Sequence, residues 1–324
     1  MADLLMPDVL IDLTLLEVKD LADATATRQG RKDTPFGTYL FAGWDPGAEL
    51  ARHVERQVFG EVFGNSPSLL AAEYGPYEGA SLFACVLDHR RRLPVGGIRL
   101  VLPDDADADE RAHARVAADA ATLGTAPPAP AAHGACGLKS LDDLARVWGR
   151  TPEDLGGEEG RALEPARAWD IATLAVAPEY RRGLVSLALY QACCTAARRS
   201  GAAWFVTILD VVVLRQLQAR LGHPFAPVPR TSPLRYLDSP ASVPCTSDLE
   251  DWERRLAERD PVLHETLFEG CGLEPAISHP DWAGVPHLVA QVRDRRRQGR
   301  LGAQRPGPLA VSTSGTRSGL TGGQ

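Results

Sequence analysis

Two apolar stretches, each followed directly by a helix-type segment, restrict the fold of this chain more than any other feature. AWDIATLAV, at 168–176, leads through a turn with two arginines into GLVSLALYQACCTAARRS. AAWFVTILD, at 202–210, leads into VVVLRQLQARL. Each helix-type segment stops at a glycine, Gly201 or Gly222, as helices commonly do. Successive strand–helix units of this kind predict a sheet that contains parallel strands and has helices packed on its faces.

An amphipathic helix and a hairpin are predicted before these units. In residues 48–63, apolar side chains recur at every fourth position, the spacing of one helix face: Leu50, Val54, Val58 and Val62. SLFACVLD, from Ser81, and VGGIRLVLP, from Val95, are apolar stretches joined by a charged loop. This pattern predicts two antiparallel strands.

The chain after Gly222 adds further extended stretches and a helix. HPFAPVP and LRYLDSPASVP are read as extended, and LEDWERRLAERDPVLHETLFEG as a helix broken at Pro261. The order is then helix, hairpin, insertion, strand, helix, strand, helix, strand, strand. It predicts an α/β (α+β) fold, with a mixed central sheet flanked by helices.

Composition divides the chain into three parts. Residues 1–45 are expected to form an N-terminal extension, 46–290 the main domain, and 291–324 a basic, disordered tail. An insertion rich in Ala, Asp and Pro occupies about 104–165. It contains a predicted helix, SLDDLARVWG, with Ser140 as its N-cap.

Charge and cysteine usage argue against several classes of protein. The net charge is −7 and the basic residues gather after Arg293, so the acidic body argues against general nucleic-acid binding. The sequence lacks an apolar run long enough for a membrane span and a cationic secretion signal at its start, so a cytoplasmic protein is expected. The six cysteines form no C-x-x-C pair, and no metal site is expected.

The turn at Arg181, Arg182 and Gly183 has two interpretations. A helix N-terminus with free N–H groups binds anions such as pyrophosphate, and arginines suit phosphate oxygens. The alternative is a solvated turn, because only three of the 35 Lys and Arg residues are lysines and arginine is common everywhere in this chain.

Three local matches make residues 48–248 resemble the GNAT superfamily of N-acyltransferases. LAVAPEYRRGLVSLAL resembles the acyl-donor motif of that family, a strand followed by R/Q-x-x-G-x-G/A and a helix. VGGIRLVLP resembles its third strand, and GAAWFVTILDVVVLRQLQARLGHPF its fifth strand and the helix after it. The resemblance implies a GNAT-like sheet in which the parallel fourth and fifth strands splay apart.

Within that superfamily the chain is most similar to acyl-homoserine-lactone synthases and long-chain N-acyl amino acid synthases. RQVFGEVF resembles their early R-x-x-V-F segment, GGIRL their strand with a functional arginine, and WDIATLAV their E-x-x-R-x-x-V strand. The chain departs from the motifs at three positions. Tyr180 and Val185 stand where the donor motif has Arg/Gln and a small residue, and Thr173 stands where the synthases have arginine.

The resemblance implies direct acyl transfer from acyl-CoA or acyl carrier protein to a small amine or amino acid. It assigns the catalytic positions to Asp170, as base, and Arg99. The donor would be bound by Val176, Arg181, Arg182, Gly183 and Leu184, and the acceptor by Arg56, Phe59 and Thr173. Tyr190 and Tyr236 are further candidates for the acid that protonates the departing thiolate.

Two other functions stay open at this point. The imperfect donor motif also fits a catalytically silent GNAT-like domain that binds a ligand or partner. The acidic body would suit a third possibility, an enzyme that acylates a protein lysine.

Overall fold

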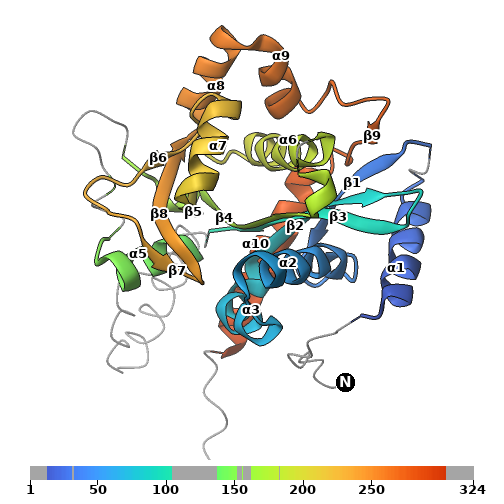
Figure 1. Cartoon of the computed structure of the whole chain (residues 1–324), viewed down its shortest axis with the longest axis horizontal. Helices are drawn as coiled ribbons and strands as arrows, with labels where there is room; N and C mark the ends of the chain where they lie inside the picture. The colour runs from blue at the N-terminus through green and yellow to red at the C-terminus, as the bar shows by residue number, and fades with distance from the viewer. Residues whose placement is uncertain are drawn as a thin grey trace, which may run out of the picture.

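The structure is a computed structural model of the chain (Figure 1). It describes residues 13–30, 33–103, 137–151, 155, 162–181 and 183–303. Arg182 and most of the insertion expected at 104–165 lie outside the described residues.

A mixed sheet of nine strands organises the described part of the chain. Its order is β6-β8-β5-β4-β3-β2-β1-β9, with β7 paired to β8. The β4–β5 and β1–β9 pairs are parallel and the other pairs are antiparallel. The strands are β1 Phe36–Ala42, β2 Ser81–Asp88, β3 Leu93–Val101, β4 Ala168–Val176, β5 Trp204–Asp210, β6 Ala226–Pro227, β7 Leu234–Tyr236, β8 Ser239–Asp248 and β9 Ile277–Ser278.

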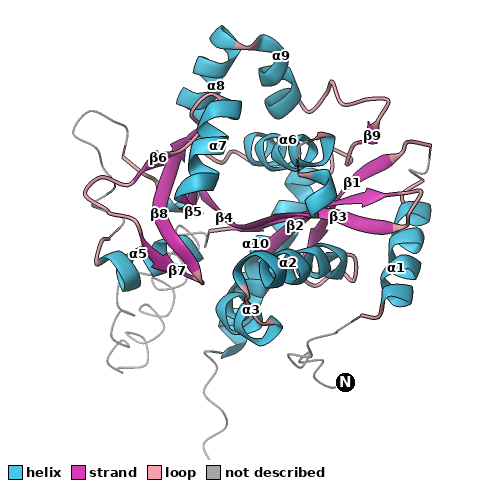
Figure 2. Ribbon diagram, in the orientation of Figure 1, coloured by secondary structure: helices cyan, strands magenta, loops and turns pink. Residues whose placement is uncertain are grey.

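Helices cover both faces of this sheet, with α2 on one side and α6 on the other (Figure 2). The longer helices are α1 Leu15–Arg28, α2 Ala48–Phe63, α3 Pro67–Tyr74, α5 Lys139–Trp148, α6 Leu184–Arg199, α7 Val211–Leu221, α8 Leu249–Arg259 and α10 Val285–Ala303. The short turns are η1 Gly75–Ala80, η3 Pro165–Arg167, η4 Pro178–Tyr180, α9 Pro261–His264 and η5 Glu265–Glu269. Within the described residues, none of the helices combines the length and apolar content that crossing a membrane requires.

Two adjacent glycines let α6 and α2 approach opposite faces of β3. A Cβ on Gly96 would lie 2.7 Å from Cγ1 of Val185 on α6. A Cβ on Gly97 would lie 3.0 Å from the carbonyl oxygen of Ala51 on α2. Since side chains alternate between the faces of a strand, this pair brings both helix layers close to the centre of the sheet.

The core is divided by the sheet into layers. Trp169 and Phe205, 0 % and 1 % exposed, pack with α6 and α7 on one face. Tyr39 and Phe83 pack with α1 and α2 on the other. Burial of each such side chain contributes roughly 1.5–3 kcal/mol, so these layers fix how the helices sit on the sheet.

The predicted fold class is confirmed, as are the hairpin and both strand–helix units. The pattern of a helix broken at Pro261 is confirmed too, because α8 ends at Arg259 and α9 begins at Pro261.

The outer parts of the chain differ from the expectation. Strand β1 pairs with β2 along its whole length, from Phe36 to Ala42, so the first 45 residues contribute a strand to the main sheet. At the other end, α10 continues to Ala303 beyond the expected boundary at 291. The reason is local packing, since Val292 is fully buried and Arg296 donates to the carbonyl oxygens of Leu102 and Gly137.

Candidate active site

Strands β4 and β5 are paired only at their beginnings. The parallel ladder joins Ala168 to Trp204, Trp169 to Phe205 and Asp170 to Val206, and then stops. Beyond it β4 stays paired with β3 and β5 with β8, so the two strands diverge. We refer to the region past Asp170 and Val206 as the β4–β5 opening. The expectation of a splayed parallel pair is met by this ladder.

A cavity of about 160 Å³ lies at the β4–β5 opening. Both strands line it, with Ile171 to Leu174 from β4 and Thr207 to Asp210 from β5. Helices from both faces of the sheet also contribute, α2 and α3 on one side and α6, α7 and α8 on the other. The cavity therefore passes through the plane of the sheet.

The part of the cavity on the α6 side is apolar. Its lining includes Leu217 and Leu221 of α7, Phe225, Trp252 of α8, and the side chains of Cys193 and Cys194. Burial raises the pKa of Cys193, which keeps this thiol protonated. Such a wall suits a hydrocarbon chain.

A β-bulge shapes the wall on β4. Arg99 of β3 pairs with Thr173 and the next residue, Leu100, pairs with Ile171, so Ala172 has no partner across β3. Ala172 and Thr173 both line the cavity, and the Tyr74 hydroxyl donates a long hydrogen bond of 3.4 Å to the Ala172 carbonyl oxygen. Bulges re-aim backbone groups, and this one lies where the strands diverge.

A buried polar cluster supports Tyr236, another residue of the cavity wall. The Lys139 Nζ donates to Asp143 Oδ2 at 2.5 Å, Glu73 Oε2 at 2.8 Å and the Tyr236 hydroxyl at 2.9 Å. The Tyr236 hydroxyl in turn donates to Asp143 Oδ2. Burial raises the pKa of Tyr236, so the hydroxyl stays protonated in the physiological range. The cluster fixes its position.

Asp170, the predicted base, lies directly at the start of the opening but behind the wall. Its side chain is 0 % exposed, and Ser140 holds both oxygens, the backbone N–H at 2.6 Å and Oγ at 2.7 Å. Burial raises the pKa of Asp170 to about 7, against the lowering effect of the Ser140 hydrogen bonds. Asp170 is not among the described residues that line the cavity.

Ser140 has a different role from the one predicted for it. The N-cap of α5 is Leu138, and Ser140 is the second residue of the helix. A backbone N–H in the first turn has no partner within its own helix. That of Ser140 is therefore available to Asp170, thirty residues later in the chain.

Arg99 lies in a buried ion-pair network, away from the cavity wall. Its Nε and Nη2 both donate to Glu55, at 3.3 and 2.7 Å, and its Nη1 donates to Glu78 at 2.6 Å. The guanidinium also lies 4.7 Å from the ring centroid of Phe83 and 4.8 Å from that of Tyr74. The donors of Arg99 are thus bound within the protein.

The residues predicted for the acceptor divide into two groups. Phe59 and Thr173 line the cavity, as do Tyr190 and Tyr236. Arg56 pairs with Glu49 at 3.1 Å and is not among the described lining residues.

The residues predicted for the donor form the turn before α6. Arg181 Nε donates to the carbonyl oxygen of Val176 at 3.1 Å, and Gly183 precedes Leu184, the first residue of the helix. The N-terminus of α6 has no side-chain cap. Tyr180, at the first motif position, donates its hydroxyl to Asp88 at 2.9 Å. The turn therefore offers backbone N–H groups to a ligand, whereas the Tyr180 hydroxyl is already bound to Asp88.

Sequence reasoning missed four polar residues of this region: Tyr74, Lys139, Asp143 and Asp210. Only Lys139 carries a signal in the sequence, because it is one of three lysines in an arginine-rich chain. Tyr74, Asp143 and Asp210 have no such signal. They come close to the cavity only through the fold, as Tyr74 of α3 does when it joins Tyr236 of β7 in the wall.

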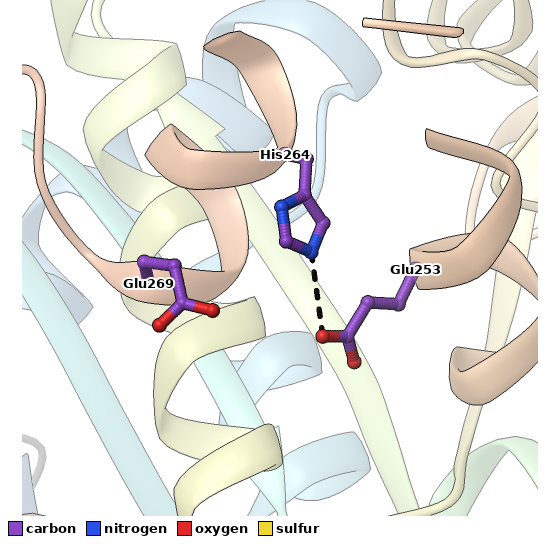
Figure 3. Close-up of side chains that lie close together, drawn as sticks. All are labelled: Glu253, His264 and Glu269. Atoms are coloured by element: carbon purple, nitrogen blue, oxygen red, sulfur yellow. Dashed lines mark hydrogen bonds and ion pairs between the residues drawn. The ribbon is translucent and has the colours of Figure 1, made fainter. Parts of the chain in front are cut away.

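A second titratable group lies away from the cavity, at Glu253, His264 and Glu269 (Figure 3). Their ligand-type atoms lie within 4.8 Å of one another, and His264 Nε2 is 3.4 Å from Glu253 Oε1. Arg198 of α6 pairs with both carboxylates, at 3.0 Å to Glu253 and 2.6 Å to Glu269. The geometry is that of an ion-pair cluster joining α6 to α8 and η5.

Comparison with known proteins gives distant structural similarity. No family model matches the sequence, and no curated protein matches it. The CoA-dependent acyl-homoserine lactone synthase BjaI, solved with SAM and isopentyl-CoA, is similar with a TM-score of 0.45 and 16 % identity over 79 % of this chain and 98 % of that one. A putative N-acetyltransferase from Lactobacillus plantarum has a TM-score of 0.39 and 12 % identity over 67 % and 99 % of the two chains.

The acyl-homoserine lactone synthase LasI is similar at a TM-score of 0.38 and 12 % identity, over 66 % of this chain and 89 % of that one. Likeness at this level leaves the function of the chain to be argued from its own residues. The structural neighbours include acyl-homoserine lactone synthases and a putative N-acetyltransferase.

Proposed function

We propose that this chain is an N-acyltransferase, which moves an acyl group from a thioester to the amine of a small molecule. The observation that carries the proposal is the β4–β5 opening. A parallel ladder ends at Asp170 and Val206, and a cavity with an apolar wall on one side and tyrosine hydroxyls on the other passes through it.

The donor would span this opening. Its acyl chain would lie against Leu217, Phe225 and Trp252, where the apolar wall compensates for its removal from water. Its phosphate would lie at the uncapped N-terminus of α6, near Gly183 and Arg181. Acyl-CoA and acyl carrier protein share the phosphopantetheine arm that this arrangement requires, and both are proposed donors.

The reaction forms one bond and breaks another. A neutral amine attacks the thioester carbonyl, an amide C–N bond forms, the C–S bond breaks, and the thiolate leaves. The amine loses a proton and the thiolate gains one. Tyr74 and Tyr236 line the cavity with neutral hydroxyls. To donate to the carbonyl oxygen or to the departing sulfur, each O–H would turn away from its present acceptor, the Ala172 carbonyl oxygen or Asp143.

Asp170 is the proposed final acceptor of the amine proton. Its pKa of about 7 suits a base that works near neutral pH, and its charge acts on the hydroxyls of both Tyr74 and Tyr236. Because the carboxylate lies behind the wall, the proton would reach it through a hydroxyl or a water molecule. Asp170 thus acts through the wall and does not contact the substrate.

A second candidate function is that of a domain that binds the thioester without turnover. It is favoured by Tyr180 and Val185, which replace the motif residues and are used in packing. The Tyr180 hydroxyl is bound to Asp88, and Val185 is 2 % exposed against Gly96. Both functions require the cavity to bind a thioester, and only the transferase also forms an amide.

One experiment separates the two. The protein is incubated with acyl-CoAs and acyl-pantetheines of short, medium and long chains, with and without a mixture of primary amines and amino acids. Binding is followed by the rise in melting temperature, which a ligand specific for the folded state produces. Turnover is followed by thiol release and by the mass of the amide. A shift with amide formation supports the transferase, a shift without it supports the binding domain, and no shift contradicts both.

A further inference from the structure

We infer that the acceptor is an amine with a second cationic group and no carboxylate, a diamine being the simplest example, and that Asp210 binds this second charge. The inference rests on the proposed function and names the substrate class of the same cavity. It starts from Asp210, whose carboxylate belongs to the wall and is half-buried.

Asp210 is the last residue of β5, and its carboxylate caps the start of α7. Val206 packs with the cluster beneath α5, whereas its neighbour Phe205 packs with α6. Because side chains alternate along β5, Asp210 lies on the same face as Val206. An acyl chain against Leu217, Phe225 and Trp252 would leave the Asp210 carboxylate uncovered for an acceptor.

The carboxylate of Asp210 is held in place and still has capacity to bind. Its Oδ1 accepts from the N–H groups of Val212 at 2.7 Å and Val213 at 3.4 Å, and its Oδ2 accepts from Ser239 Oγ at 2.8 Å. A carboxylate offers about four lone-pair sites, so these bonds leave room for an ammonium group. The carboxylate also occupies the N-terminus of α7, the end of the helix that favours negative charge, so an acceptor carboxylate could not bind there.

Further hydrogen-bond acceptors surround this point. Ser242 Oγ donates to Ser239, and both serines line the cavity. Asn65 donates its Nδ2 to the carbonyl oxygen of Leu237, a lining residue, and to Asp238. Asn65 is itself buried and is not a described lining residue, so it supports Leu237 from behind the wall. This rim suits a donor of N–H groups.

The two buried cations near the wall, Arg99 and Lys139, are already matched by carboxylates. Arg99 is bound by Glu55 and Glu78. Lys139 is bound by Glu73 and Asp143. An acceptor carboxylate would therefore lose its water beside groups of its own sign, which is costly.

An ammonium group would gain a charge-assisted hydrogen bond to Asp210. The free amine at the other end would then reach the thioester. The proposed acceptor thus differs from a diamino acid such as lysine only in lacking the carboxylate, and the effect of the carboxylate can be measured.

The test uses matched acceptors with whichever acyl thioester the protein turns over. Cadaverine and lysine differ only by the carboxylate, and cadaverine and pentylamine by the second amine. Rates are measured by thiol release and the products by mass. We expect kcat/KM for cadaverine to exceed that for lysine and that for pentylamine by about tenfold or more, the factor that one such hydrogen bond supplies.

The variant Asp210→Asn should raise KM for cadaverine by about tenfold with little change in kcat, and should leave pentylamine unaffected. Asparagine caps a helix as well as aspartate does, so α7 is preserved. Asp248→Asn is the matched control, because Asp248 caps α8 in the same way and is not a described lining residue.

Lysine used as well as cadaverine, or equal behaviour of the two variants, would overturn the inference and leave the proposed function standing. Absence of amide from every thioester and every amine would instead overturn the proposed function, and the inference with it.

Discussion

Ser140 binds both oxygens of the Asp170 carboxylate, through its backbone N–H at 2.6 Å and its Oγ at 2.7 Å. This contact joins the start of α5 to the last paired residue of β4, at the point where the sheet opens. It fixes the position of the carboxylate that we propose as the proton acceptor. It also makes the pKa of Asp170 depend on the single hydroxyl of Ser140.

Removal of this hydroxyl should move the pH profile of the reaction. In Ser140→Ala, Asp170 loses a hydrogen bond that favours its charged form, so the pKa rises above about 7. The rising limb of kcat/KM against pH should shift to higher pH in this variant. Ser68→Ala is a control, since its exposed hydroxyl bonds Ser66 Oγ on the surface of α3. An unchanged profile would exclude Asp170 from the reaction.

The same carboxyl should make the protein less stable as pH rises. Its pKa is about 7 in the folded state, above its ordinary 3.8, so the folded state binds more protons between these values. The free energy of unfolding should therefore fall as pH rises from about 4 to 7, by up to about 4 kcal/mol from this group.

Urea unfolding of the wild type and of Asp170→Asn across this range tests that expectation. The readout is the slope against pH, because the substitution also changes the bonds to Ser140. The slope should flatten in the variant. A slope that is the same in both proteins would show that Asp170 does not titrate in this range.

Arg99 should act on stability more than on acceptor binding. Arg99→Met leaves Glu55, which is 4 % exposed, without its partner, and uncompensated buried charge costs about 3–5 kcal/mol. The double variant Arg99→Met with Glu55→Leu should recover part of that loss in urea unfolding. A stable single variant with a large rise in acceptor KM would instead support the role that the sequence resemblance implied.

The contrast between Arg99 and the strands shows what the sequence could predict. Local patterns, such as the alternation in 168–176 and the glycine stops, were enough for the hairpin and the two strand–helix units. They did not show that residues 36–42 form a strand of the same sheet or that α10 continues past residue 291. The partners of Arg99 lie on α2 and η1, 44 and 21 residues away, and no local pattern shows that they meet. No local pattern shows that Ser140 meets Asp170, thirty residues later, or that the β4–β5 ladder ends at Asp170 and Val206.

The apolar wall should set the preferred chain length. Phe225→Leu enlarges the cavity beside α7 and should shift the preferred acyl-CoA to a longer chain, measured as kcat/KM across a chain-length series. Phe268→Leu is the matched control, since Phe268 is 1 % exposed in the core and is not a described lining residue. An equal effect of both substitutions would mean that the change acts through general loosening of the core.

The central claim is that a thioester donor places its acyl chain in the cavity at the β4–β5 opening. The most direct measurement compares the melting temperature with acyl-pantetheine and with pantetheine alone, since this arm is common to CoA and carrier-protein donors. We predict a larger rise with the acylated form for one class of chain length, and a change in that class in Phe225→Leu. Equal melting temperatures with both forms at every chain length would contradict the claim.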